Sequence, residues 1–192
     1  MAFGAAMTMS TPSWWYKKQR TLAAHLLQPL AMLWRLGAQW RRFDEKHGYE
    51  GSGHMILLGN ATAGGTGKTP LAVALAQLLD DQDCGFVTRG FGGTVKGPHM
   101  VTPTDKAELV GDEALILSTY APTCVARDRL MGVKTLDQVC QVMIIDDGLQ
   151  NHPGLRRDTV LLVVDAYDGF GNGLIIPAGP LREPPQAALA KA

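Results

Sequence analysis

An apolar run in this chain leads directly into a glycine-rich turn. Residues 55–58 are all apolar, and residues 59–70 then read Gly-Asn-Ala-Thr-Ala-Gly-Gly-Thr-Gly-Lys-Thr-Pro. This order predicts a buried strand, a turn and a helix that begins at Gly67-Lys68-Thr69. The glycines let several backbone N–H groups approach an anion, and the helix N-terminus adds its dipole. Together the three parts predict a cradle for a polyphosphate.

The residues of this turn are the predicted nucleotide-binding set. Lys68 is expected to reach the β- and γ-phosphates, and the Thr69 hydroxyl is expected to bind Mg²⁺. The common pattern has glycine where this chain has Thr62. An ordinary turn with an accidental Gly-Lys-Thr is therefore the alternative, which the agreement of strand, turn and helix disfavours. The predicted cofactor-binding residues are Thr62, Ala63, Gly64, Gly65, Thr66, Gly67, Lys68 and Thr69.

A second apolar run, at residues 142–145, ends in the two carboxylates Asp146 and Asp147. Beside a phosphate loop, the first is the expected partner of Mg²⁺, and the second is expected to bind metal or to polarise the nucleophile. The alternative is a solvent-exposed Asp-Asp-Gly turn. The predicted metal ligands are Thr69, Asp146 and Glu113.

Asp112 and Glu113 follow a glycine at the predicted start of a helix. Phosphoryl transfer to an alcohol needs a carboxylate near the acceptor hydroxyl, and the glycine gives Asp112 the freedom to reach it. The alternative is structural: Asp112 caps the helix and Glu113 complements its dipole. Spacing alone leaves both interpretations open.

Arg89 stands at the end of a further predicted strand and begins the run Arg-Gly-Phe-Gly-Gly. An arginine at this place can meet phosphate charge, and the glycines allow a mobile loop over a ligand. A wide surface turn with a solvated arginine is the alternative. Arg127 and Arg129, with Asp128 between them, are either a further anion contact or an ion pair within a helix. The predicted catalytic residues are Asp112, Lys68, Asp147 and Arg89.

The order of apolar runs and helical segments in residues 51–192 predicts an α/β fold. Strands are expected at 54–59, 84–88, 123–126, 142–146 and 160–165, and helices at 68–79, 112–119 and 129–138. Such alternation is typical of a parallel sheet covered by helices on both faces. We therefore predict a P-loop NTPase-like core in which ligands gather beyond the carboxyl ends of the strands.

Residues 1–50 are predicted to form a separate, basic segment. They carry seven Lys and Arg against three Asp and Glu, whereas residues 51–192 carry eleven against fifteen. A helix is predicted from Pro29 to Phe43, with polar residues on one face. Its basic and polar side carries Arg35, Gln39, Arg42 and Lys46, and its apolar side carries Leu30, Leu33, Trp34, Leu36 and Trp40.

Two interpretations of this helix remain open. It either lies in the plane of an anionic membrane surface, or packs on the protein core with its basic face in solvent. Nucleic acid is not favoured as a partner, because no basic stripe with interleaved aromatic residues runs through the core.

Further blocks of residues recur in an order that matches one family. In chain order the blocks are Pro12 to Tyr16, Gly59 to Pro70, Arg89 to Gly93, Val110 to Glu113, Ala126 to Arg129, Asp146 to Gln150, Arg157-Asp158, Phe170 to Gly173 and Pro177 to Glu183. With them the chain resembles the tetraacyldisaccharide 4'-kinases, the lipid A 4'-kinases of Gram-negative bacteria. The loop of that family carries Thr at the position of Thr62.

The resemblance implies transfer of the γ-phosphoryl group of ATP to the 4'-hydroxyl of a tetraacylated glucosamine disaccharide 1-phosphate, which forms lipid IVA. It implies Asp112 as the general base, Lys68 and Thr69 on the phosphates and Mg²⁺, and Asp146 and Asp147 on the metal and nucleophile side. It also implies an N-terminal helix docked on the cytoplasmic face of the inner membrane, and so a peripheral protein. The expected partners are the lipid-linked disaccharide and the anionic membrane surface, and no protein partner is inferred.

The chain departs from the family pattern at two places. Asn151 stands where the family usually has histidine, and His152 follows one place later, so no role is carried over to that imidazole. The family continues beyond the position of Ala192 into a second lobe, so we expect the chain to be a fragment. Two alternatives stay open: an inactive piece of the kinase, and a nucleotide switch of the GTPase type. No Asn-Lys-x-Asp segment that reads guanine occurs in these residues.

Overall fold

The computed structural model describes residues 11–17, 19–40, 49, 51–79, 83–146 and 155–192. The helices are the 3₁₀ turn η1 (Ser13–Tyr16) and α1 (Leu22–Leu26), α2 (Gln28–Trp40), α3 (Lys68–Leu78), α4 (Ala107–Val110), α5 (Asp112–Ser118), α6 (Arg129–Leu136) and α7 (Pro185–Leu189). The strands are β1 (His54–Gly59), β2 (Cys84–Thr88), β3 (His99–Met100), β4 (Thr123–Val125), β5 (Val142–Ile145) and β6 (Thr159–Leu162).

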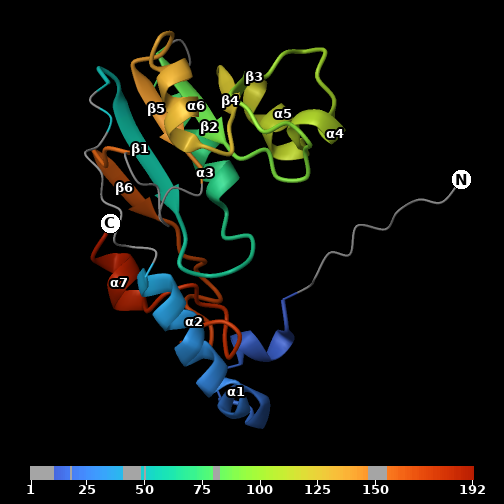
Figure 1. Cartoon of the computed structure of the whole chain (residues 1–192), viewed down its shortest axis with the longest axis vertical. Coiled ribbons are helices and arrows are strands. Elements are labelled where there is room, and N and C mark those ends of the chain that lie inside the picture. Colours follow the sequence, from blue (N-terminus) through green and yellow to red (C-terminus); the bar gives the residue numbers. More distant parts are fainter. Residues whose placement is uncertain (1–10, 18, 41–48, 50, 80–82, 147–154) are drawn as a thin grey trace, which may run out of the picture.

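The strands form one sheet in the order β3-β4-β2-β5-β1-β6 (Figure 1). All neighbours are parallel except β3 and β4, which are antiparallel. The predicted α/β fold with a mainly parallel sheet is confirmed. The expectation of a purely parallel sheet is wrong at one edge, because β3 has only two half-buried residues and no apolar run that would mark it in the sequence.

The core lies on both faces of the sheet because successive side chains of each buried strand point to opposite sides. In β1, Met55 and Leu57 pack in one cluster with residues of α6. Ile56 and Leu58 pack in another cluster with Ala72 and Ala76 of α3 and with residues of α5. Helices therefore cover both faces, as the alternation in the sequence predicts.

The helices α1 and α2 lie beyond one end of the sheet (Figure 1). Helix α2 begins at Gln28, one residue earlier than predicted, and the predicted end at Phe43 lies outside the described residues. Seven large apolar side chains of these helices are exposed, and they are Leu22, Leu26, Leu30, Met32, Leu33, Trp34 and Leu36. The described apolar side of α2 thus faces solvent rather than the protein core. No helix in the described part of the chain is long and apolar enough to cross a membrane.

Candidate active site

The glycine-rich turn follows β1 directly and is hydrogen-bonded to the C-terminal segment, residues 172–182. The Ala63 N–H donates to the Pro180 carbonyl oxygen at 2.7 Å, and the Arg182 N–H donates to the Ala61 carbonyl oxygen at 2.8 Å. Thr62 and Leu181 form an isolated antiparallel bridge between these bonds. A segment more than a hundred residues away in the sequence therefore fixes the first half of the turn.

Asn60 holds the turn from within. Its side chain is buried, and its amide nitrogen donates to the carbonyl oxygens of Thr62 at 2.8 Å and Gly64 at 3.3 Å. Its amide oxygen accepts a hydrogen bond from the Lys68 ammonium at 3.2 Å. Asn60 is not among the residues predicted from the sequence for this site. The signal in the sequence was a polar residue placed directly after a predicted buried strand. Its hydrogen-bond partners come together only when the turn is folded.

The second half of the turn is open. Gly64 has φ of 125° and Gly67, the residue that precedes α3, has φ of 82°, so both lie in the left-handed region that favours glycine. A Cβ atom added at Gly65 or Gly67 would meet nothing within 4 Å. The Thr66 hydroxyl is buried and has no hydrogen-bond partner among the described residues. The Cβ directions of Gly65 and Gly67 are thus open and the Thr66 hydroxyl is unpaired among the described residues, which agrees with the predicted cradle.

Thr69, at the start of α3, contacts α5. Its hydroxyl donates a hydrogen bond to Oε1 of Glu113. Two of the three predicted metal ligands are therefore brought together by the fold. A hydroxyl and a carboxylate at a helix start form an oxygen-only pair, which is the donor chemistry that Mg²⁺ prefers.

Asp112 is the first residue of α5, next to Glu113, and its side chain is exposed. The interpretation of Asp112 as the helix cap is wrong, because Gly111 occupies the capping position and no side chain caps the helix. A Cβ atom at Gly111 would lie 2.4 Å from the Phe91 carbonyl oxygen, so this position has room for glycine alone. The Asp112 carboxylate is left at the surface on the same helix end that holds Thr69.

The loop after β2 packs against that helix end. A Cβ atom at Gly90 would lie 2.6 Å from the Val110 carbonyl oxygen, which shows how closely the two backbones approach. Arg89 precedes this contact and its side chain is exposed. The loop of Arg89 therefore lies beside the start of α5, as the prediction of a shared site requires.

Asp146 follows β5, and its N–H donates to the Val87 carbonyl oxygen of β2 at 3.0 Å. This bond places Asp146 at the carboxyl edge of the sheet, where β2 leads to Arg89. Asp147, Asn151 and His152 lie outside the described residues, so their roles stay predictions. Among the residues that the structure describes, no group of three or more His, Cys, Asp or Glu side chains could hold a metal ion.

In the block from Arg127 to Arg129, the side chains of Asp128 and Arg129 have structural contacts. Asp128 caps α6 by accepting a hydrogen bond from the Leu130 N–H at 3.0 Å. The Arg129 side chain is buried and donates to the Arg127 carbonyl oxygen at 3.4 Å. Arg127 is exposed.

Comparison with known proteins tests the resemblance. The sequence model of one family, described as tetraacyldisaccharide-1-P 4'-kinase, matches residues 23–192. The chain belongs to this family. It is 45% identical over 188 residues to the tetraacyldisaccharide 4'-kinase of Jannaschia sp. (strain CCS1), an alignment that covers 96% of this chain and 56% of the relative. It is 44% identical over 191 residues to the tetraacyldisaccharide 4'-kinase of Parvibaculum lavamentivorans, with 96% and 55% covered.

A solved structure agrees with this membership. The crystal structure of the "apo" form of LpxK from Aquifex aeolicus in complex with ATP superposes with a TM-score of 0.77 at 26% identity. The match covers 88% of this chain and 57% of that one. The chain thus spans a little over half the length of the kinase-family relatives that it matches.

Proposed function

We propose that this protein is an ATP-dependent kinase of lipid A biosynthesis. It transfers the γ-phosphoryl group of ATP to the 4'-hydroxyl of a tetraacylated glucosamine disaccharide 1-phosphate and forms lipid IVA. The observation that carries the proposal is the junction of the open glycine-rich turn with the start of α5, through Thr69 and Glu113. Family membership supports the choice of nucleotide and acceptor.

The turn has the donors that a triphosphate needs. The N–H groups of residues 64–69 and the Thr66 hydroxyl would bind phosphate oxygens, and Lys68 would leave Asn60 to reach the outer phosphates. Thr69, Glu113 and Asp146 would hold Mg²⁺. The bound ion would neutralise charge on the β- and γ-phosphate oxygens.

The acceptor side is formed by α5 and the loop of Arg89. Asp112 is exposed at the start of α5, so it can accept the proton of the 4'-hydroxyl as that oxygen attacks the γ-phosphorus. Arg89 would meet the charge of the transferred group, and Asp147 would act on the nucleophile side. Transfer of this kind depends mostly on positioning and on charge neutralisation, which is the work of these three side chains together with Lys68 and the turn.

The exposed apolar side of α1 and α2 provides the attachment to the membrane in this proposal. The side chains that face solvent are large and apolar, and Arg35 of α2 adds positive charge beside them. An amphipathic helix of this kind binds in the plane of an anionic surface. The protein would lie on the cytoplasmic face of the inner membrane, where its lipid-linked acceptor is found.

Asp112 gives the test of the activity. In an assay of phosphoryl transfer from [γ-³²P]ATP to the disaccharide 1-phosphate, Asp112→Ala is expected to lower kcat by about 10²–10⁴-fold with unchanged affinity for ATP. Glu108→Gln, which alters an exposed acid of the neighbouring helix α4, is the matched control and should leave kcat unchanged. An unaltered kcat for Asp112→Ala removes this residue as the base. Preference for GTP over ATP in a competition experiment would support the nucleotide-switch alternative.

Membrane attachment has its own test. Leu33→Asp on α2 is expected to weaken binding to phosphatidylglycerol vesicles by at least about ten-fold, because a buried leucine contributes roughly 1.5–3 kcal/mol. Leu78→Asp places the same change on an exposed leucine of α3 and should have no effect. Neutralising Arg35, Arg42 and Lys46 together is expected to cost about 1 kcal/mol per charge. Equal binding by Leu33→Asp and Leu78→Asp would contradict the proposed surface.

A further inference from the structure

The turn η1 belongs to the nucleotide site in its contacts, although its sequence places it in the N-terminal segment. The ring of Trp15 is buried, and its Nε1 donates to the Pro177 carbonyl oxygen at 3.2 Å. The Trp15 carbonyl oxygen accepts a hydrogen bond from the Asn172 N–H at 2.7 Å. Trp15 therefore fixes η1 to the same C-terminal segment that supports the glycine-rich turn.

Tyr16 reaches the glycine-rich turn itself. Its hydroxyl donates to the Ala63 carbonyl oxygen at 3.3 Å, and a Cβ atom at Gly64 would lie 3.6 Å from the same hydroxyl. Asn60 holds the carbonyl oxygens on either side, those of Thr62 and Gly64. Three successive carbonyl oxygens of the turn are thus each held by a side chain, and the middle one depends on Tyr16.

The direction of these carbonyls decides the direction of the donors. In a planar trans peptide the C=O and N–H bonds point in opposite directions. Because Tyr16 donates to the Ala63 carbonyl oxygen, the N–H of Gly64 must point away from Tyr16. Because Asn60 donates to the Gly64 carbonyl oxygen, the N–H of Gly65 must likewise point away from the Asn60 amide. Within the described residues, neither of these two N–H groups donates to another protein group.

We propose that Tyr16, anchored by Trp15, is a positioning residue for phosphate binding: it orients the Ala63–Gly64 peptide so that the Gly64 N–H faces the nucleotide. The inference rests on the proposed function, since it assumes that the turn binds a polyphosphate. Gly64 has no Cβ and lies at φ of 125°. Its peptide can therefore rotate readily unless a side chain holds it. Donors oriented in advance lower the cost of binding.

The test compares Tyr16→Phe with the parent chain in calorimetric titrations with Mg·ATP, Mg·ADP and adenosine. Loss of the hydroxyl is expected to raise the Kd of both phosphate-bearing ligands by about five-fold, the usual effect of one neutral hydrogen bond. The Kd of adenosine should stay unchanged, and the melting temperature should fall by no more than the loss of one hydrogen bond explains. Tyr120→Phe removes the hydroxyl of an exposed tyrosine after α5 and is the matched control, with no expected effect on any ligand. In ¹H–¹⁵N spectra, the Gly64 amide should shift in Tyr16→Phe alone.

The possible results separate the inference from the function on which it rests. If the folded parent chain binds no Mg·ATP, the proposed function fails. If the parent binds and Tyr16→Phe binds equally well, Tyr16 does not position the turn. A uniform loss for all three ligands with a lower melting temperature would mean that Tyr16 only stabilises the fold, which also overturns the inference. Trp15→Phe, which keeps an aromatic ring but replaces the indole and removes its N–H, should follow Tyr16→Phe with a smaller increase in Kd.

Discussion

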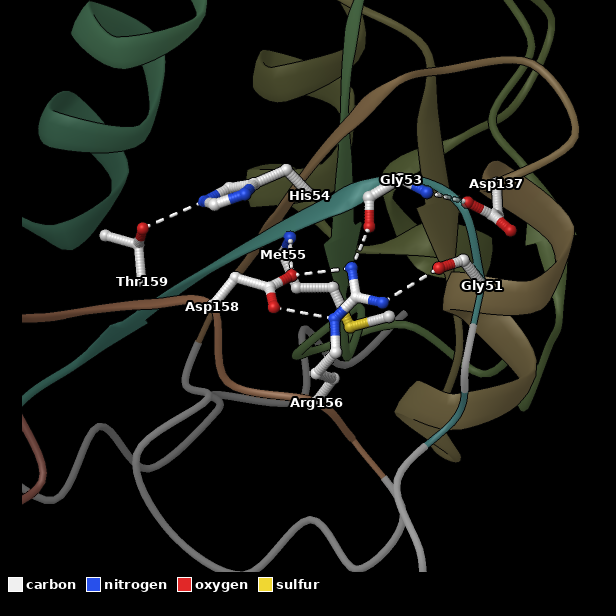
Figure 2. A network of polar contacts seen from close by, with 8 residues as sticks. All are labelled: Gly51, Gly53, His54, Met55, Asp137, Arg156, Asp158 and Thr159. Atoms are coloured by element: carbon white, nitrogen blue, oxygen red, sulfur yellow. Dashed lines mark hydrogen bonds and ion pairs between the residues drawn. The ribbon is translucent and has the colours of Figure 1, made fainter.

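The two ends of the parallel sheet use polar groups in opposite ways. At the amino ends of β1 and β6, Arg156 lies between two segments of the chain (Figure 2). Its guanidinium donates to both carboxylate oxygens of Asp158 and to the carbonyl oxygens of Gly51 and Gly53, at 2.6 to 2.9 Å. At the carboxyl ends, the glycine-rich turn leaves the Thr66 hydroxyl and the N–H groups of Gly64 and Gly65 without a partner among the described residues.

The contrast separates a structural site from a binding site. In the Arg156 network, Asp158 also accepts from the Met55 N–H at 2.9 Å, and Asp137 accepts from the Gly53 N–H at 2.7 Å (Figure 2). The chain itself completes these bonds, so the network needs no ligand. In the turn, protein groups hold the carbonyl oxygens, and the donors remain for an anion.

Lys68 should give the largest effect, because it is the one charged donor of the turn. Lys68→Met is expected to raise the Kd of Mg·ATP by about 100-fold, since hydrogen bonds to charged groups contribute roughly 1.5–3 kcal/mol each. Isothermal titration measures this change. Lys96→Met, at an exposed lysine between β2 and β3, is the matched control and should bind as the parent does. Equal affinities for the two variants would show that the turn is not the site of the phosphates.

A substitution of Asn60 should have the second-largest effect on nucleotide affinity, because its side chain is hydrogen-bonded both to carbonyl oxygens of the turn and to Lys68. Asn60→Ala removes all three contacts from a buried position and is expected to raise the Kd of Mg·ATP by about ten-fold. Asn60→Asp keeps an acceptor for Lys68 but turns a carboxylate oxygen toward the Thr62 and Gly64 carbonyl oxygens, so it should not restore affinity. A lower melting temperature with unchanged Kd in both variants would show that Asn60 stabilises the fold and does not contribute to nucleotide binding.

Local pattern predicted most of the fold, whereas the roles of the site residues stay predictions. The apolar runs of β1, β2, β4 and β5 are continuous because helices cover both faces of these strands, and their positions in the structure agree with the sequence to within a residue. Thr69 and Glu113 were predicted as one metal set, and the fold brings them into contact.

The parts that escaped prediction depend on contacts between distant segments. Asn60 acquires its role from carbonyl oxygens whose direction is set by the folded turn. Tyr16 lies among residues assigned to the membrane segment, yet it contacts Ala63, and Trp15 contacts a segment more than 150 residues later. The capping alternative for Asp112 is excluded because Gly111 takes the capping position, where the approach of Phe91 leaves room only for glycine. None of these contacts has a signature in sequence spacing.

A substitution of Arg156 tests the network at the amino ends of β1 and β6. Arg156→Met is expected to lower the free energy of unfolding by about 1–2 kcal/mol, a value reduced because the guanidinium is partly exposed. Arg157→Met changes the neighbouring, exposed arginine and is the matched control, with an expected effect within about 0.5 kcal/mol. Urea denaturation gives both values. The Kd of Mg·ATP should be the same in the two variants. A selective loss of ATP affinity in Arg156→Met would contradict the assignment of the Arg156 network to a purely structural role.

The pH dependence of stability should show the smallest effect and should have a definite sign. The hydrogen bonds from Arg156, aided by that from the Met55 N–H, hold the pKa of Asp158 below its ordinary value, against the opposing effect of burial. A carboxyl group with a lowered pKa in the folded state stabilises the fold fully above its unfolded pKa of about 3.9, and this contribution is lost as the pH falls through the folded value. The difference in melting temperature between the parent and Asp158→Asn should therefore be constant from pH 6 to about pH 4.5 and shrink below about pH 4. Asp105 and Asp165, whose pKa values are also lowered by hydrogen bonds, are present in both proteins and cancel in this difference. A difference that stays constant down to pH 3 would show that Arg156 does not favour the ionised form of Asp158, and the paired network at the amino ends would then contribute through packing alone.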